Sequence, residues 1–252
     1  QPAEEGGGGG LEMCKDGMMD NFNIDEVYGM HNWPGVELGK FAIRSGPFFA
    51  ASDFIEATIS GKGGHAAKPH ETIDPTVIAS QIVVALQTIA SRRADPVEQV
   101  VVSITSFETS STAFNVIPQE VKIKGTVRTL DPDVRVLAEK EFLRITELTA
   151  EAMGGSADAK FTRGYPVMSN SNAQTEFAAK VARDVAGECA EAPLVMGGED
   201  FAYMLEERPG AYILLGNGDS SPVHHPKYNF NDDAIPFGCS WLVELVEQKM
   251  PV

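Results

Sequence analysis

The middle of the chain opens with Phe54-Ile55-Glu56-Ala57-Thr58-Ile59, where apolar and polar residues alternate. A period of two predicts a strand with one buried face. The expected elements that follow are a helix opened by Asp74-Pro75, strands over 100–107 and 121–128, a helix opened by Asp131-Pro132 and a strand over 157–161. In both helices Asp can cap the first turn and Pro can occupy it. The order is β-α-β-β-α-β, which predicts a ferredoxin-like domain.

The segments on either side of this domain show a different pattern of predicted elements. Short apolar strands are expected at 27–30, 40–44 and 211–215, and helices at 174–185 and from 234 to about 249. Alternating helices and apolar strands predict an α/β layer. We therefore predict one α/β domain made of residues 1–49 and 165–252, interrupted by the βαββαβ domain over residues 50–164.

The composition argues against several classes of protein. The 252 residues include 20 basic and 36 acidic side chains, a net charge of −16, which disfavours binding to nucleic acid or to an anionic membrane. No apolar run approaches the roughly 20 residues that cross a bilayer. Three scattered cysteines make neither a disulfide framework nor a cysteine zinc cluster. A cytoplasmic location is the default expectation.

Two features near the start of the chain could bind metal. Glu4-Glu5 precedes the glycine run 6–10; in a metal hydrolase one carboxylate of such a pair binds the ion and its neighbour takes a proton from water. The alternative is a solvated acidic pair. His31 follows an apolar strand, where ligands bind in α/β sheets, and the alternative is a loop histidine bonded to backbone.

Other polar residues suggest a substrate site. The glycines of 61–66 can hold His65 out from a sheet, where it could donate a hydrogen bond to a developing oxyanion. The same segment formally fits the glycine pattern of dinucleotide-binding proteins, but that interpretation fails because Pro69 prevents the helix that must follow. Asn115 and Arg128 could hold a substrate carboxylate, although Arg128 also fits a plain polar strand face.

Two further pairs stay ambiguous. The pair His224-His225 indicates either a metal site or an ordinary surface loop. Glu199-Asp200 is interpreted as an acidic pair that favours a helix dipole.

These motifs, in this order, resemble those of hippurate hydrolase-type amidohydrolases, in the aminoacylase and carboxypeptidase superfamily of two-metal amide hydrolases. The matching segments are Gln-Pro-Ala-Glu-Glu-Gly (1–6), Tyr-Gly-Met-His-Asn-Trp-Pro (28–34), Gly-Gly-His-Ala-Ala (63–67), Phe-Asn-Val-Ile-Pro (114–118), Gly-Thr-Val-Arg-Thr (125–129), Gly-Gly-Glu-Asp-Phe (197–201) and His-His-Pro-Lys-Tyr-Asn-Phe-Asn-Asp (224–232). The resemblance covers essentially the whole chain. It implies a zinc-peptidase-like catalytic α/β domain interrupted by a lid or dimerisation domain.

The resemblance also implies roles. Glu4 would be the general base and acid, and His65, often supplied by the partner subunit, would steady the tetrahedral oxyanion. Asn115 and Arg128 would contact the carboxylate of a small N-acyl amino acid. The implied metal ligands are Glu5, His31 and His224, the last preferred over its neighbour because the family pattern is His-x-Pro. Two divalent ions, Zn²⁺, Mn²⁺ or Co²⁺, suit this donor set, and a homodimer through the lid domain is expected.

One departure separates the chain from the family pattern. The family carries an upstream Cys-Gly-His-Asp-x-His segment with further metal ligands, and nothing like it occurs here. We therefore expect the chain to be the later part of a longer catalytic domain. An alternative of another class is a non-catalytic dimerisation or small-molecule binding module derived from the family.

Overall fold

The computed structural model describes residues 2–250, which divide into two compact units. Unit 1 comprises the described parts of 1–49, 168–195 and 199–252, and unit 2 comprises 50–167 and 196–198. The catalytic and lid roles that the sequence suggests for such a division stay predictions. No helix among the described residues has the length and apolar character needed to cross a bilayer.

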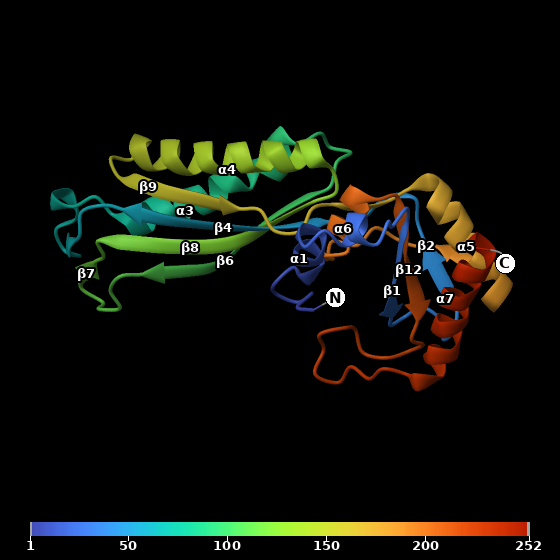
Figure 1. Cartoon of the computed structure of the whole chain (residues 1–252). Helices are drawn as coiled ribbons and strands as arrows, with labels where there is room; N and C mark the ends of the chain where they lie inside the picture. Colours follow the sequence, from blue (N-terminus) through green and yellow to red (C-terminus); the bar gives the residue numbers. More distant parts are fainter. Residues whose placement is uncertain (1, 251–252) are drawn as a thin grey trace. The chain divides into compact units, whose positions relative to one another are not determined.

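Unit 2 has the ferredoxin-like arrangement that the sequence predicts. Its elements are β4 (Ala51–Ser60), β5 (Gly64–His65), a 3₁₀ turn (Pro69–Glu71), α3 (Pro75–Leu86), a π turn (Ile89–Arg93), β6 (Val100–Thr109), β7 (Val116–Ile117), β8 (Glu120–Thr129), α4 (Pro132–Ala152) and β9 (Ser156–Thr162). The main sheet is antiparallel with the order β6-β8-β4-β9. Helices α3 and α4 lie side by side on one face of it (Figure 1).

Local signals explain why these elements form. Asp74 accepts a hydrogen bond from the backbone N–H of Thr76, and Asp131 accepts from those of Asp133 and Val134, so both predicted caps are confirmed. The buried side of β4 alternates with its open side, as a sheet with one covered face requires. The enclosed core is aliphatic apart from Phe142.

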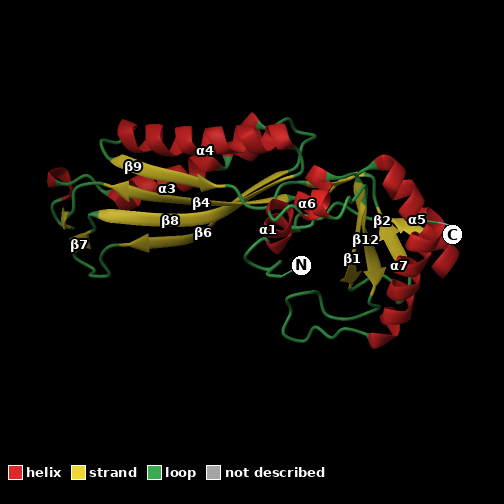
Figure 2. Ribbon diagram, in the orientation of Figure 1, coloured by secondary structure: helices red, strands yellow, loops and turns green. Residues whose placement is uncertain are grey.

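Unit 1 is an α/β sandwich around a small mixed sheet. Its elements are α1 (Gly9–Lys15), α2 (Met18–Asn21), β1 (Val27–Trp33), β2 (Phe41–Ile43), β3 (Gly46–Phe49), β10 (Met168–Asn170), α5 (Asn172–Ala186), β11 (Cys189–Glu191), α6 (Ala202–Glu207), β12 (Gly210–Gly216), a 3₁₀ turn (Asp232–Ala234) and α7 (Ile235–Lys249). The sheet order is β1-β12-β2-β11, with β1 parallel to β12 (Figure 2). A separate antiparallel pair joins β3 to β10.

Strand β12 shows how the two faces of this sheet are covered. Its residues Tyr212 and Leu214 pack with α1, α2 and α6, whereas Ala211, Ile213 and Leu215 pack with α5 and α7. Alternate residues of one strand point to opposite faces, so helices cover both sides. The α/β fold class predicted for the flanking segments is confirmed.

Candidate functional site

The two adjacent carboxylates near the start of unit 1 lie in different surroundings. Residues 4–7 form a turn in which the carbonyl of Ala3 accepts from the N–H groups of Gly6, Gly7 and Gly8, at 3.3, 2.9 and 3.1 Å. Ala3 has a φ of 59°, a left-handed conformation uncommon without glycine. The turn leaves Glu4 half-buried and Glu5 exposed. The two neighbouring carboxylates therefore differ in exposure, which allows them to have different roles.

The glycine run after the pair is only partly a loop. Helix α1 begins at Gly9, and the N–H of Gly10 donates to Asp200 Oδ2 at 2.8 Å. A Cβ at Gly10 would lie 2.8 Å from the backbone oxygen of Asp200, closer than side chains approach backbone. This glycine therefore permits α1 to pack against the segment that precedes α6.

Three acidic neighbours alter the titration of Glu4. Its pKa is raised to about 7 by burial, the largest cause, together with repulsion from Glu199, Glu5 and Asp200, while His224 opposes the shift. Glu199 is 3% exposed and Asp200 is fully buried. A carboxyl group that titrates near neutrality can both accept and return a proton.

Glu199 and Asp200 do more than the dipole partnership that the sequence suggests. Glu199 Oε1 accepts from the N–H of Phe201 at 3.1 Å, just before α6, which fits that interpretation. Its Oε2 accepts from the hydroxyl of Tyr212 at 2.6 Å. Burial raises the pKa of Tyr212, and the charge of Glu199 raises it further. The sequence does not reveal this arrangement, because Tyr212 lies in a strand that reads simply as buried.

His31 lies within β1, not after it as predicted. The strand continues to Trp33 because its parallel pairing with β12 extends to Gly216. Nδ1 of His31 lies 2.6 Å from the carbonyl of Asn32, which can only accept, so Nδ1 carries the proton. Nε2 then keeps the lone pair that a metal ion requires. The ring also packs edge-on against Trp33, which fixes its orientation.

His224 lies on a long loop of unit 1 and approaches Glu5. Its Nε2 lies 3.6 Å from Glu5 Oε1, so a predicted carboxylate ligand and a predicted imidazole ligand face each other. Its φ of 65° is again left-handed. A hydrogen bond between the amide of Asn32 and the hydroxyl of Tyr228 ties this loop to the end of β1. Asn32 and Tyr228 both lie in motifs of the sequence, but the sequence alone does not indicate that they interact.

Within residues 2–250 no three His, Cys, Asp or Glu side chains gather closely enough to hold an ion. The carboxylate and imidazole of Glu5 and His224 are donors that fit Zn²⁺, Mn²⁺ or Co²⁺. In a neutral ring, Nε2 of His31 is an imidazole donor of the same kind. The three-residue ligand set remains a prediction.

Unit 2 carries the predicted substrate contacts at two places. Strands β6 and β8 form a hairpin whose tip carries Asn115. His65 in β5 lies against this hairpin tip, because it pairs with Val116 in β7 and the carbonyl of Asn115 accepts from the N–H of Ala66 at 2.9 Å. The side chains of His65 and Asn115 are exposed. Arg128 lies near the far end of β8, opposite Ser52. Burial lowers the pKa of Arg128, and Asp53 opposes the shift.

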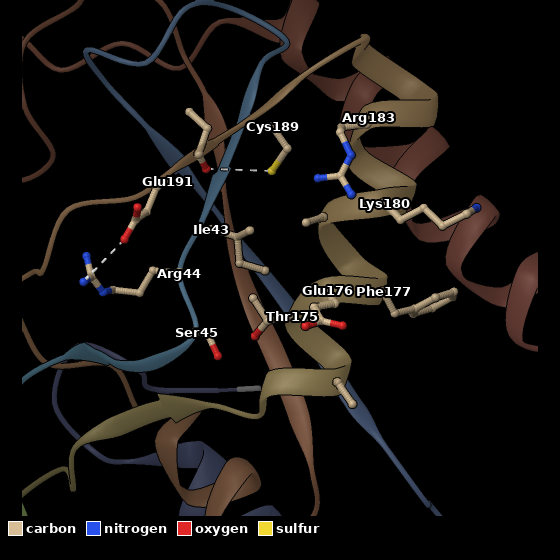
Figure 3. Close-up of a pocket in the computed structure, with 13 residues that line it drawn as sticks. Ile43, Arg44, Ser45, Thr175, Glu176, Phe177, Lys180, Arg183, Cys189 and Glu191 are labelled. Atoms are coloured by element: carbon tan, nitrogen blue, oxygen red, sulfur yellow. Dashed lines mark hydrogen bonds and ion pairs between the residues drawn. The ribbon is translucent and has the colours of Figure 1, made fainter.

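Unit 1 also contains a groove of about 860 Å³ between α5 and the β2–β11 edge (Figure 3). None of the predicted site residues lines it. Arg44 pairs with Glu191 at 3.6 Å, and Arg183 points toward Cys189. Burial raises the pKa of Cys189 to about 11, against the effect of Arg183, so its thiol stays protonated at neutral pH. Cys189 is therefore not an activated nucleophile.

Known proteins resemble the chain over nearly its whole length. The model of peptidase family M20/M25/M40 matches residues 1–248. An N-acetyl-L-cysteine deacetylase of Bacillus subtilis is 38% identical over 99% of this chain and 59% of its own length. A hippurate hydrolase of Campylobacter jejuni is 37% identical, over 97% of this chain and 64% of its own length. The chain thus spans about three fifths of the length of these curated relatives.

The fold has a counterpart among solved structures. A dinuclear metal binding peptidase of the M20 family from Bacillus subtilis superposes with a TM-score of 0.83 at 28% identity. The match covers 99% of this chain and 64% of that one.

Proposed function

Because the chain belongs to peptidase family M20/M25/M40, we propose that it takes part in metal-dependent hydrolysis of the amide bond of N-acyl amino acids, including hippurate. The relatives named as a deacetylase and a hippurate hydrolase support this substrate class. They do not favour the alternative of a non-catalytic dimerisation or binding module. We propose the cytoplasm as its location, in keeping with such small substrates.

The observation that carries the proposal is the approach of Glu5 to His224 directly beside Glu4. The two ligand candidates are 219 positions apart, yet Glu5 Oε1 lies 3.6 Å from His224 Nε2. Glu5, His224 and His31 would hold divalent metal, and the dinuclear relative supports a pair of ions. When bound, Zn²⁺, Mn²⁺ or Co²⁺ supplies Lewis acidity and lowers the pKa of water.

The chain's own residues then divide the remaining work. Glu4 accepts the proton of the attacking water and returns it to the nitrogen of the leaving amine. His65 donates a hydrogen bond to the oxyanion that develops from the scissile carbonyl. Asn115 donates to the substrate carboxylate, and the guanidinium of Arg128 can bind the same group through two N–H donors.

The geometry of unit 2 supports a homodimer. Arg128 and Glu120 lie eight residues apart on β8, about 26 Å at roughly 3.3 Å per residue. The hairpin tip with His65 and Asn115 lies beyond Glu120, so one small substrate cannot touch both ends of the same unit 2. A second copy of the chain, associating through unit 2, would supply the missing end.

Hydrolysis and metal content of the Glu4→Gln variant test the proposal. We measure amino acid release from hippurate and N-acetyl amino acids, with bound metal quantified, on the chain and on the longest natural product that contains it. Glu4→Gln should lower kcat by about 10²–10⁴-fold while metal is retained. Glu12→Gln, an exposed carboxylate of α1, is the matched control and should leave kcat unchanged. Full activity of Glu4→Gln, or no hydrolysis by any unmodified form, would overturn the proposal.

A further inference from the structure

The hairpin tip of unit 2 displays one aromatic side chain that no role yet explains. Phe114 has a relative exposure of 107%, the highest among the exposed large hydrophobic residues of the described chain. Single exposed apolar residues are common and need no function. Phe114 differs in its position, immediately before Asn115.

The loop that carries Phe114 is held in place. The N–H of Val116 donates to the carbonyl of Ala113 at 3.3 Å, which makes Phe114 and Asn115 the two central residues of one turn. The bond from Ala66 to Asn115 ties this turn to the strand of His65. Because the backbone of this turn is already constrained, little backbone entropy is lost when a ligand packs against the ring.

The order of residues along the tip matches the order of groups in the proposed substrate. His65 lies opposite Val116, so Asn115 stands between it and Phe114. In an N-acyl amino acid, the α-carbon with its carboxylate and side chain lies on one side of the scissile carbonyl, and the acyl group lies on the other. With His65 at the carbonyl and Asn115 at the carboxylate, the next position along the tip, Phe114, corresponds to the amino acid side of the molecule rather than to the acyl side.

We propose that Phe114 is a specificity-determining residue that packs against the side chain of the substrate's amino acid and favours apolar ones. The Cα atoms of Phe114 and Asn115 are about 3.8 Å apart, so one residue can hold the carboxylate while the other covers the adjacent side chain. The inference rests on the proposed hydrolysis and refines it: the apolar leaving amino acid, rather than the acyl group, is selected here.

Hippurate provides an internal control, because its amino acid is glycine and has no side chain. Phe114→Ala should lower kcat/KM for N-acetyl-leucine by about tenfold, mainly through KM, as expected for a lost apolar contact. The same variant should change kcat/KM for hippurate by less than about twofold. Phe114→Leu should restore most of the preference, since it keeps an apolar surface. Phe54→Ala, which removes another exposed aromatic ring of unit 2, should change neither substrate.

The outcomes separate this inference from the proposed function. An equal loss for both substrates, or no change for either, would overturn the role of Phe114 while leaving the hydrolysis intact. A change in sedimentation of Phe114→Ala would make the residue a subunit contact and would also overturn it. If the unmodified protein hydrolyses neither substrate, the proposed function fails and this inference fails with it.

Discussion

Unit 2 buries a matched ion pair and one aliphatic core, whereas unit 1 leaves the paired carboxylate and imidazole of the candidate site exposed. In unit 2 the buried Asp53 is matched by Arg135, through bonds of 2.9 and 2.6 Å, and one aliphatic core lies beneath two helices. In unit 1 the side chains of Glu5 and His224 are 76% and 68% exposed, and His224 has a left-handed backbone conformation. Among the described strands β1 has β12 as its sole partner.

The contrast separates a scaffold from a site. Strained backbone persists at functional sites when the surrounding structure holds it. In unit 1 that support comes from Asp200 beneath α1 and from the Asn32–Tyr228 bond. In unit 2 the exposed hairpin tip extends from a four-stranded antiparallel sheet.

The largest effect is expected from a substitution that breaks the buried ion pair of unit 2. Asp53→Ala leaves Arg135, 9% exposed, without its counterion, which should cost about 3–5 kcal/mol. Both tryptophans, Trp33 and Trp241, lie in unit 1, so tryptophan fluorescence reports on that unit, while far-ultraviolet circular dichroism reports on both. In urea we expect the dichroism transition to move and the fluorescence transition to stay.

An exposed ion pair of unit 2 serves as the matched control. Glu139 and Arg163 lie 2.6 Å apart with side chains 29% and 48% exposed, so Glu139→Ala should cost no more than about 1 kcal/mol. Equal movement of both transitions in Asp53→Ala would mean that the two units unfold together. The comparison between a self-sufficient unit 2 and unit 1 would then fail.

The same contrast explains how much of the fold can be predicted from the sequence. The stripe of Ile78, Ile82 and Leu86 in α3 and the alternation of β8 are local periodic signals, and they predicted unit 2 closely. In unit 1, α1 was not predicted, because a run of glycines favours a loop. The residue against which α1 packs, Asp200, lies 190 positions away from Gly10 in the sequence. Strands β3, β10 and β11 have four, three and three residues, too short for a periodicity to register.

In the candidate site too, local sequence signals were predictive, whereas features that depend on distant contacts were missed. The motifs predicted Glu5 and His224 as metal ligands, and the structure brings their side chains together. Glu199 and Asp200 also lie in a motif, but their effect on Glu4 could not be predicted in this way, because it depends on burial rather than on residue type. The end of β1 was misplaced at His31, because the extent of a strand is set by its partner.

A second prediction perturbs unit 1 through its packing glycine. Gly10→Ala forces a methyl group against the backbone oxygen of Asp200, so α1 or the segment before α6 must shift. Overpacking of this kind should cost about 1–3 kcal/mol, seen as a move of the fluorescence transition in urea. Gly6→Ala is the control, because a Cβ there meets nothing within 4 Å, and it should leave that transition in place. Equal effects at both glycines would show that flexibility, not close approach, is what the run provides.

The smallest expected effect concerns the pH dependence of unit 1. Burial alone would raise the pKa of Glu26, but hydrogen bonds from Lys249, Tyr28 and Gln174 outweigh it and lower the pKa. A lowered folded-state pKa gives stability that is fully present above the ordinary pKa of glutamate, about 4.3, and is lost as the pH falls through the folded value.

Glu26→Gln should therefore lower the Tm followed by tryptophan fluorescence at pH 7 by no more than about 2–4 °C. This difference from the unmodified protein should shrink as the pH falls from 5 to 3, because the carboxyl group becomes protonated and resembles the amide. Glu247→Gln, at an exposed position of α7, should produce no such pH-dependent difference. A gap that widens in acid would mean that burial, not the hydrogen bonds, controls Glu26, and the end of α7 would then not be fastened to the segment before β1 by charge.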